Sequence, residues 1–322
     1  MRSAIILAAG KGTRMKSALN KVMHPVSNKP MIGHIVCSLR KAGVDNIVVV
    51  VGHGAESVRE YLGDSVRYAV QEPQLGTGHA VMQAQCLADL DGDTLILNGD
   101  GPCIQSETID RVFAANADSE MTVLTAVLPD GERYGRIIRN AEGYVERIVE
   151  AKDCTPQELA VTEINTGIFC FKNRLLFAHL KEIRNDNAQQ EYYLTDLVAI
   201  FNQCGLRVNA LVADDPQETM GVNDRIDLAK AQKWMTRHEC ERHMRNGVTI
   251  IDPETVYIDV GVKIGADTVI YPNVIIQGDT VIGERVTILS NSFLRNAVIA
   301  DEVCIDSSKI VESSVGARTT IG

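Results

Sequence analysis

Isoleucine recurs every six residues between positions 258 and 288 of this 322-residue chain. A small or β-branched residue stands two places before each isoleucine, at Val256, Val262, Thr268, Val274, Thr280 and Val286. An antiparallel strand does not hold a period of six over six units. A left-handed parallel β-helix does, because each hexapeptide forms one flat side of a triangular coil. The period therefore predicts a β-helix in which each isoleucine points inward and stacks on its equivalent one coil away.

The period loosens after residue 288, where the apolar positions become Leu294, Ile299, Ile305, Ile310, Val315 and Ile321. At about 18 residues per coil, roughly four coils fit between Gly247 and Gly322. The last repeat has no polar cap of the kind that closes a repeat array. We therefore expect a partial β-helix, cut within its repeats.

Residues 1 to about 225 alternate short apolar runs with helical patterns. Strands are expected at 4–7, 46–51, 66–70 and 94–97, and helices at 31–41, 55–61 and 78–86. This order predicts an α/β domain with a mainly parallel, Rossmann-like sheet covered by helices on both faces. Ligands of such sheets gather at the carboxyl ends of the strands.

One long helical pattern, residues 224–245, joins the two regions and ends at Asn246-Gly247. Its Trp234 and Met235 are expected to pack against a neighbouring domain. The predicted organisation is a first domain at 1–225, a linker helix at 226–246 and the β-helix at 247–322.

Composition restricts the classes of partner. The formal net charge of −10 argues against nonspecific binding to nucleic acid or to an anionic membrane.

The eight cysteines include no C-x2-C pair, so we expect reduced thiols. There is no signal-peptide pattern and no stretch of about 20 apolar residues. We expect a soluble, cytoplasmic protein that binds neither nucleic acid nor membrane.

The first expected strand runs into the sequence LAAGKGTRM, residues 7–15. Small residues at the end of a buried strand let the backbone approach a base and phosphates closely, and Lys11, Arg14 and Lys21 add positive charge. A Walker A loop is excluded by its spacing, and the dinucleotide fingerprint fails because Met15 stands where it needs glycine. Lys11 has two interpretations, a phosphate ligand or a solvated loop cation.

This loop, followed by Lys21 and Pro30, resembles the signature of sugar-1-phosphate nucleotidyltransferases. Further blocks follow in order: QEPQLGTGHA from Gln71, NGD ending at Asp100, YGR from Tyr134, IVEAKD from Ile148, EINTG from Glu163, EYYLTD from Glu191 and GVN from Gly221. Together with the hexapeptides, they resemble the family of bifunctional N-acetylglucosamine-1-phosphate uridylyltransferase/glucosamine-1-phosphate acetyltransferases over the whole chain.

The resemblance implies a role for each matching residue. The backbone of Leu7, Ala8, Ala9 and Gly10 would line the nucleotide pocket. The Gln71 amide would pair with uracil, since it offers a donor and an acceptor side by side, and Gly76 and Thr77 would close over the base. Arg14 and Lys21 would be the catalytic cations that hold the triphosphate and the leaving pyrophosphate.

The resemblance also implies a metal and a sugar site. Asp100 and Asn223 would bind Mg2+, which prefers hard oxygen ligands. The alternative for Asn223 is a cap of the helix that follows it, and the metal role is favoured. Gly135, Glu150, Asn165 and Thr166 would hold the sugar, and Asn98 and Gly99 would adjoin the substrates. The sequence departs from the family pattern at Asn98, Gly101 and Cys103, which leaves the exact sugar open.

The expected reaction joins UTP and N-acetylglucosamine-1-phosphate to give UDP-N-acetylglucosamine and pyrophosphate. The sugar phosphate is already an anion, so no general base is expected. Two alternatives remain: a UDP- or dTDP-glucose pyrophosphorylase with an appended β-helix, and a regulatory subunit of the same fold, against which the retained Arg14, Lys21, Asp100 and Asn223 argue. The resemblance places the acetyltransferase half in later coils, outside this chain, and implies a homotrimer formed through the β-helix.

Overall fold

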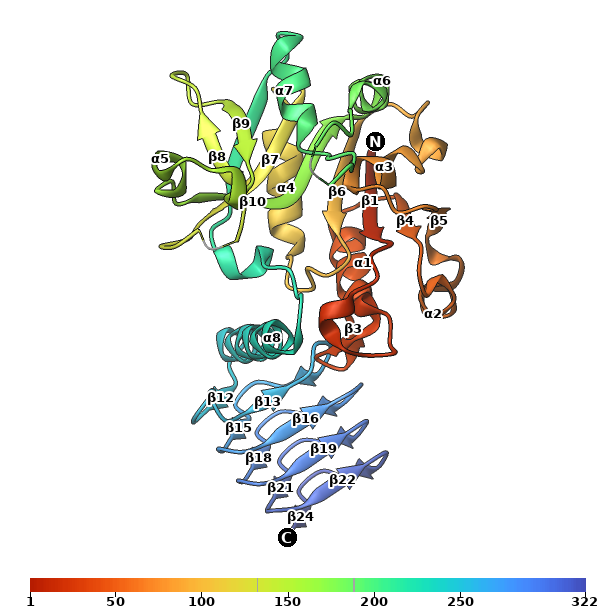
Figure 1. Cartoon of the computed structure of the whole chain (residues 1–322). Helices are drawn as coiled ribbons and strands as arrows, with labels where there is room; N and C mark the ends of the chain where they lie inside the picture. The colour runs from red at the N-terminus through yellow and green to blue at the C-terminus, as the bar shows by residue number, and fades with distance from the viewer. Residues whose placement is uncertain (132, 188) are drawn as a thin grey trace. The chain divides into compact units, whose positions relative to one another are not determined.

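The computed structural model describes residues 1–131, 133–187 and 189–322. The chain forms two compact units (Figure 1). The first comprises Met1–His24 and Pro30–Asp227, and the second comprises Pro25–Lys29 and Leu228–Gly322. The sequence did not indicate that a short segment near residue 27 belongs with the C-terminal repeats.

The described residues of the first unit contain a nine-stranded sheet. Its main path runs in the order β11 (Val208–Val212), β7 (Met121–Val127), β10 (Glu163–Lys172), β6 (Asp93–Asn98), β1 (Arg2–Ala8), β4 (Asn46–Val51) and β5 (Arg67–Val70). The pairs β1–β4, β1–β6, β4–β5 and β7–β11 are parallel. Only β10 runs against its neighbours β6 and β7 on this path. The predicted mainly parallel α/β sheet is therefore confirmed.

Two short strands extend the sheet beside β10. Strand β8 (Arg136–Arg139) pairs antiparallel with β10 at the level of Ile164, and β9 (Val145–Val149) pairs antiparallel with β8. The four-residue helix α5 (Pro156–Leu159) follows and begins with a capping box, in which Thr155 and Glu158 satisfy each other's backbone amides.

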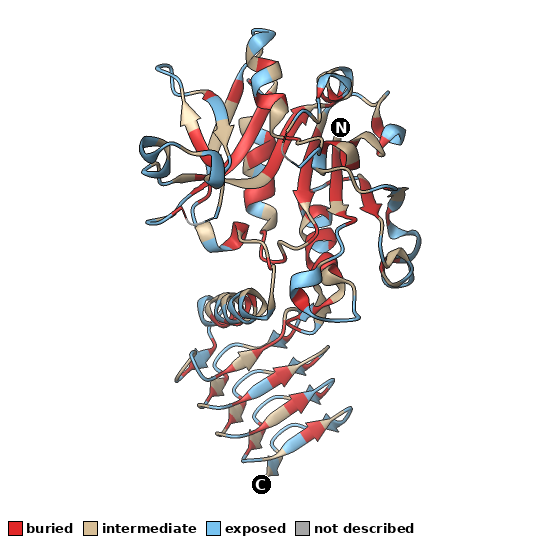
Figure 2. Cartoon of the chain, in the orientation of Figure 1, coloured by how far each residue is buried: buried red, intermediate tan, exposed pale blue. Residues whose placement is uncertain are grey.

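Side chains alternate between two cores because successive residues of a strand point to opposite faces. On one face Ile6, Val49 and Leu97 pack with helices α1 (Met31–Lys41), α2 (Ala55–Leu62) and α4 (Ser106–Ala115). On the other face Ile5 and Val48 pack with helices α3 (Thr77–Met82), α6 (Asn173–His179) and α7 (Asp196–Gln203). Figure 2 shows the buried strands of the sheet in red.

Most predicted elements agree with the structure to within two residues at each end, but the helix expected at 78–86 is wrong in its extent. Helix α3 ends at Met82. From there the backbone changes to i→i+3 hydrogen bonds, with Ala84 N donating to Val81 O and Leu87 N donating to Ala84 O. A short 3-10 turn at Gln85–Leu87 completes the segment.

In the second unit, helix α8 (Arg225–Arg245, here from Leu228) precedes a parallel β-helix. Its short strands form three parallel sheets, in the orders β12-β15-β18-β21-β24, β13-β16-β19-β22 and β14-β17-β20-β23. They begin with Thr249–Ile250 in β12 and end with Thr320–Ile321 in β24. The predicted hexapeptide β-helix is confirmed.

The strand register explains why the isoleucine period loosens. Tyr257 pairs with Ile275, 18 residues later, whereas Val281 pairs with Val298 at 17 and Phe293 with Lys309 at 16. The coils therefore shorten by one residue at a time. Each strand still presents an apolar residue to the interior, so the spacing of the apolar residues shrinks with the coil.

Both positions of the hexapeptide pattern are buried. Ile258, Ile270, Ile276, Ile282 and Ile288 are at most 2% exposed, and so are the small or β-branched residues that stand two places before each isoleucine. Ile264 is the exception and is partly buried. The interior therefore contains two residues from each repeat, not the isoleucine alone.

The segment Pro25–Lys29 attaches to the second unit through Ser27. Val260 N donates to Ser27 Oγ at 2.8 Å, and Ser27 N donates to Gln232 Oε1 at 2.7 Å. Ser27 and Asn28 adopt positive φ, at 45° and 63°, in the turn between β2 (Pro25–Val26) and β3 (Lys29–Pro30). These bonds explain why the hairpin clusters with the repeats.

Across the described residues, we find no helix with the length and hydropathy that a membrane crossing requires.

Candidate active site

A cavity of about 330 Å³ opens at the carboxyl ends of β1 and β6. Its lining contains ten of the predicted site residues: Leu7, Ala8, Ala9, Gly10, Lys21, Gln71, Gly76, Thr77, Asn98 and Asp100. Val22, Gln74, Ala80 and Glu191 complete it. The structure thus brings together segments that lie up to 184 residues apart in sequence, from Leu7 to Glu191.

Two glycines allow close packing of the segments that form the cavity. Gly99 N donates to Leu7 O at 2.9 Å, and a Cβ at Gly99 would lie 3.1 Å from that oxygen. Gly12 adopts φ +59°, and a Cβ there would lie 2.5 Å from Lys21 Cβ. Gly99 therefore holds β6 against β1, and Gly12 lets the loop lie against the Lys21 side chain. Lys11 is exposed and is not in the described lining.

Four predicted residues form one charged cluster beside the cavity. Lys21 Nζ lies 2.5 Å from Asp100 Oδ2 and 3.1 Å from Asn223 Oδ1. Arg14 Nη2 donates to the same Asn223 oxygen at 2.8 Å. The Lys21 and Asp100 side chains are 13% and 21% exposed. Two cationic side chains and two oxygen atoms that could bind a metal therefore meet at the edge of the sheet where phosphates are expected.

The structure distinguishes the two roles considered for Asn223. Helix α8 is capped by the next residue, because Asp224 Oδ1 accepts hydrogen bonds from the backbone amides of Ile226 and Asp227. The Asn223 side-chain oxygen instead accepts from Arg14 and Lys21. Its backbone amide donates to Asp227 at 3.1 Å, and Asp227 pairs with Arg133 at 2.9 Å. These contacts hold Asn223 toward the charged cluster.

Gln71 also lines the cavity and is 4% exposed. Its Nε2 donates to Gly76 O at 2.9 Å and lies 3.3 Å from His79 Nδ1. The amide nitrogen is thus used within the protein. Gln74, which the sequence blocks contained but the site prediction omitted, donates from its side chain to Ala9 O.

The segment that follows Gln71 is held by a second block of the sequence. Tyr192 N donates to Leu75 O and Gly78 N donates to Tyr192 O, both at 2.8 Å. Leu194 N donates to Thr77 Oγ1 at 3.0 Å. Gly76 adopts φ +100°, and a Cβ there would lie 2.7 Å from Tyr192 O. These contacts also bring Glu191, which the site prediction omitted, to the cavity.

Gly135, Asn165 and Glu150 lie at one level of three neighbouring strands. Asn165 N donates to Gly135 O at 2.8 Å. Arg136 pairs with Val149, so the antiparallel register places Glu150 opposite Gly135. Partial burial raises the pKa of the Glu150 carboxyl. None of the three belongs to the described lining of the cavity.

Asn98 connects this level with the cavity. A Cβ at Gly167, which adopts φ +78°, would lie 2.6 Å from Asn98 Nδ2. Gly167 N donates to Asn165 Oδ1 at 2.9 Å. Thr166 Oγ1 donates to Leu124 O, and Thr166 lines a second, smaller cavity with Asn98, Asp100 and Glu218. The polar residue at position 98 therefore contacts the strand that carries Asn165.

Glu218 was not predicted from the sequence, where it is one acidic residue among several. It is 5% exposed and accepts a 2.5 Å hydrogen bond from Thr108 Oγ1. Burial raises the pKa of its carboxyl to about 7, and the nearby Asp215 adds to the shift. Only the fold shows that this carboxyl lies within the protein, beside the small cavity that Asp100 also lines.

A Rossmann-like sheet, a glycine loop after its first strand and a cluster of cations with oxygen donors define a nucleotidyltransferase. The Nucleotidyl transferase family matches residues 3–219, and the family of bacterial transferase hexapeptides matches residues 261–296. The first match covers the whole of the cavity lining.

The chain belongs to the family of bifunctional GlmU proteins. It is 49% identical over 324 aligned residues to "Bifunctional protein GlmU" of Latilactobacillus sakei, with 100% of this chain and 70% of that protein covered. The corresponding proteins of Limosilactobacillus reuteri and Geobacillus thermodenitrificans are 51% and 50% identical, with 100% and 98% of this chain and 71% and 69% of theirs covered. The predicted family and uridylyltransferase class are confirmed.

A solved structure supports the fold alone. The crystal structure of a "Putative Glucose-1-Phosphate Thymidylyltransferase" from Bacillus anthracis in complex with sucrose superposes with a TM-score of 0.58 at 23% identity. The match covers 72% of this chain and 94% of that one. At this identity the match indicates shared architecture, and it gives no preference for glucose as the sugar.

Proposed function

We propose that the cavity at the carboxyl ends of β1 and β6 transfers a uridylyl group from UTP to N-acetylglucosamine-1-phosphate. The products are UDP-N-acetylglucosamine and pyrophosphate. The observation that carries this proposal is the convergence of Lys21, Arg14, Asp100 and Asn223 beside a cavity that also contains Gln71. Phosphate-binding cations and a base-recognising amide thus share one site.

The donor set suits a divalent cation. Asp100 Oδ2 and Asn223 Oδ1 both lie close to the Lys21 ammonium, at 2.5 and 3.1 Å, so the two oxygens already surround a positive charge. Carboxylate and amide oxygens are hard ligands of the kind that Mg2+ prefers. We infer that Asp100 and Asn223 hold Mg2+. When bound, the ion would neutralise charge on the phosphates.

The transfer needs little covalent chemistry from the protein. A phosphate oxygen of the sugar phosphate attacks the α-phosphorus of UTP, and the bond from that phosphorus to the bridging oxygen of the β-phosphate breaks in line. The nucleophile is already ionised, so no proton has to be removed. Arg14 and Lys21 stabilise the charge that develops on the leaving pyrophosphate, and the glycine loop orients the α-phosphate.

Gln71 gives the site its preference for uracil. Because its Nε2 is occupied by Gly76 and His79, the free side of the amide is the oxygen. This oxygen can accept from N3–H of uracil, an atom that is an acceptor in cytosine. The backbone amides of Gly76 and Thr77, which line the same cavity, can donate to the rest of the base edge.

The sugar lies toward Asn98 in this proposal. Gly135, Glu150 and Asn165 share one level of the sheet, and Asn98 contacts Gly167 beside them. The Glu150 carboxylate accepts from sugar hydroxyls. Gly135 lets the strands pack closely at this level, since a Cβ there would lie 3.2 Å from Ile148 Cγ2.

The test is a matrix of four nucleoside triphosphates against the 1-phosphates of N-acetylglucosamine, glucosamine and glucose, with pyrophosphate release as the readout. We expect the highest kcat/KM for UTP with N-acetylglucosamine-1-phosphate, and no turnover after removal of divalent cations. A higher kcat/KM for glucose-1-phosphate or for dTTP would contradict the proposed substrates. Activity unaffected by chelators would contradict the metal assignment.

We also propose that the β-helix assembles the chain into a homotrimer. Exposed β-branched side chains lie side by side on one of its flat faces, at Val281 and Val298. Two neighbouring apolar side chains on a flat face, repeated around a threefold axis, can be buried in a closed ring.

A further inference from the structure

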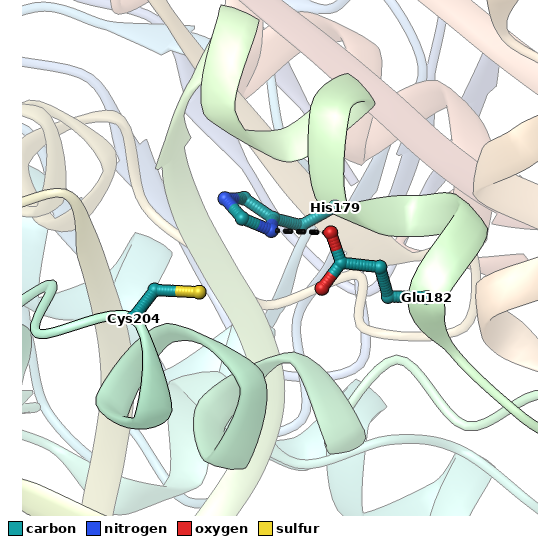
Figure 3. A group of neighbouring side chains, drawn as sticks. All are labelled: His179, Glu182 and Cys204. Carbon is teal, nitrogen blue, oxygen red and sulfur yellow. Dashed lines mark hydrogen bonds and ion pairs between the residues drawn. The ribbon is translucent and has the colours of Figure 1, made fainter.

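Three metal-binding side chains meet on the surface of the first unit, away from the cavity. His179 ends α6, Glu182 ends the 3-10 turn Leu180–Glu182, and Cys204 follows α7. His179 Nδ1 lies 3.0 Å from Glu182 Oε1, and one ligand atom from each of the three residues lies within 4.8 Å of the others. Figure 3 shows the Cys204 sulfur pointing toward the His179–Glu182 pair.

The cluster and the proposed active site lie at opposite ends of strand β6. Strand β10 runs antiparallel to β6, and its last residue, Lys172, pairs with Asp93, the first residue of β6. Helix α6 therefore leaves from the amino end of β6, whereas the cavity lies at the carboxyl end, beyond Asn98. The cluster is thus separate from the nucleotide chemistry.

The surroundings hold the imidazole in place and leave the other ligands accessible. The His179 ring packs edge-on against Phe201, with ring centroids 5.4 Å apart. Its side chain is 17% exposed, whereas that of Glu182 is 45% exposed, and Cys204 is an exposed free cysteine. One ligand is therefore fixed and two can adjust to an ion that enters from solvent.

The set of donors indicates the class of metal. A thiolate, an imidazole and a carboxylate together are typical ligands of zinc, whereas Mg2+ and Ca2+ prefer oxygen alone. Bond lengths of about 2.0–2.3 Å place two ligands of a tetrahedral zinc about 3.3–3.6 Å apart. The His179–Glu182 separation is already close to this value. A rotation of the exposed Cys204 side chain that moves its sulfur by about 1 Å would bring the sulfur to this distance from the other two ligand atoms.

We propose that His179, Glu182 and Cys204 bind one zinc ion, with water as the fourth ligand. Binding replaces the thiol proton of Cys204, so one proton is released to solvent as the Zn–S bond forms. His179 binds as the neutral imidazole through Nδ1, in place of its hydrogen bond to Glu182.

The ion would join two elements that flank a segment of the proposed active site. Residues 183–187 and 189–195 lie between the 3-10 turn that carries Glu182 and helix α7, and Cys204 follows that helix. This segment supplies Glu191 to the cavity, and its Tyr192 bonds to Leu75 and Gly78. A zinc ion bound to both flanking elements would restrain this segment from outside the active site.

The test uses the full, untagged chain after treatment with a chelator. Co2+ is the spectroscopic probe, because a cobalt–thiolate bond gives a sulfur-to-metal charge-transfer band that oxygen ligands do not give. Zn2+ affinity is measured by competition with a colorimetric chelator. The variants are Cys204→Ser and His179→Gln, and the matched control is Cys86→Ser, which changes another exposed free cysteine.

We expect one equivalent of Zn2+ and a cobalt–thiolate band in the wild type and in Cys86→Ser. Cys204→Ser should lose the band. Both cluster variants should bind Zn2+ more than about 100-fold more weakly, since even outer partners of a metal ligand contribute about 10–100-fold. Without metal, the melting temperature of Cys204→Ser should match that of the wild type, because Cys204 is exposed. A wild type without the band, or a Cys204→Ser variant that retains it, would overturn the proposal.

Discussion

At the scale of single residues, Asp100 is the proposed metal ligand whose replacement should lower kcat without disturbing the protein core. Replacing it with alanine removes a carboxylate that contacts Lys21 at 2.5 Å and leaves no buried gap, because its side chain is 21% exposed. We expect kcat to fall at least about a hundredfold, since the bound cation stabilises the transferring phosphate. Asp91→Ala, which removes an 81% exposed carboxylate before β6, is the control. Near-normal pyrophosphate release by Asp100→Ala would refute the metal assignment.

Gln71 is expected to control the choice of base. In Gln71→Ala the acceptor for uracil N3–H is lost, so kcat/KM for UTP should fall and the preference for UTP over CTP should shrink by about tenfold or more. Gln85→Ala, a nearby glutamine in the 3-10 turn after α3, should leave this ratio unchanged. A Gln71→Ala enzyme that keeps its full preference would identify Gln71 as a packing residue.

The predicted residues differ in how well the structure groups them. The loop of residues 7–15 was predictable because it follows the first strand, and strand ends meet at one edge of a parallel sheet. The roles of Lys21 and Asp100 were predicted from the resemblance to the family. Glu191 and Glu218 were not predictable in this way. Glu191 begins the EYYLTD block, but its place at the cavity depends on the bond from Tyr192 to Leu75. The place of Glu218 depends on Thr108, and both partners are distant in sequence.

At the scale of elements, the 3-10 turn Pro216–Thr219 buries Glu218 against Thr108 of α4. The pKa of this carboxyl rises from 4.5 to about 7. Between these values the folded state retains a proton that the unfolded state has lost. The free energy of unfolding therefore falls as pH increases through this window, by about 3 kcal/mol in all.

Glu218→Gln should abolish that fall, because the amide cannot ionise and can still accept from Thr108. Urea denaturation from pH 4 to pH 8 should show the variant close to the wild type at pH 4 and more stable by up to about 3 kcal/mol at pH 8. Glu107→Gln is the control, because it changes an exposed glutamate that precedes Thr108 on α4. Parallel pH profiles for Glu218→Gln and the wild type would show that Glu218 ionises normally.

Local pattern determined some elements and tertiary contacts determined others. Helix α1 and strand β4 have the predicted bounds because apolar periodicity and flanking residues agree there. The antiparallel direction of β10 has no local signature, since a strand's direction depends on its partners. Helix α3 begins where Gly78 bonds to the distant Tyr192, and beyond Met82 the backbone continues with 3-10 bonds, which the apolar periodicity did not distinguish from a longer helix.

At the scale of the whole molecule, a repeat is more predictable than a mixed sheet. Each coil of the β-helix contacts mainly its neighbours, so a period of six in the sequence is enough to specify the fold. The shortening of the coils from 18 to 16 residues follows from the loosened period, but the burial of both repeat positions required the structure. The order of the nine strands depends on pairings between distant segments, which no period encodes.

Two exposed valines of the β-helix are expected to form the contact between subunits of the proposed trimer. In the sheet formed by β14 (Lys263–Ile264), β17 (Val281–Ile282), β20 (Val298–Ile299) and β23 (Ser314–Val315), Val281 and Val298 are neighbours and are 39% and 52% exposed. Sedimentation of the wild type should give a trimer. The double variant Val281→Lys with Val298→Lys should give a monomer, because three copies of a charged face repel one another.

The fold of this variant should survive, because Lys263 already occupies the adjacent position in the same sheet. Its uridylyltransferase activity should also survive, since every residue of the proposed active site belongs to the first unit. Ile251→Lys, at a 54% exposed position just after β12, is the control for a charge added elsewhere on the β-helix and should remain trimeric. A wild type that is monomeric at high concentration would refute the trimer, and a double variant that stays trimeric would show that another face forms the contact.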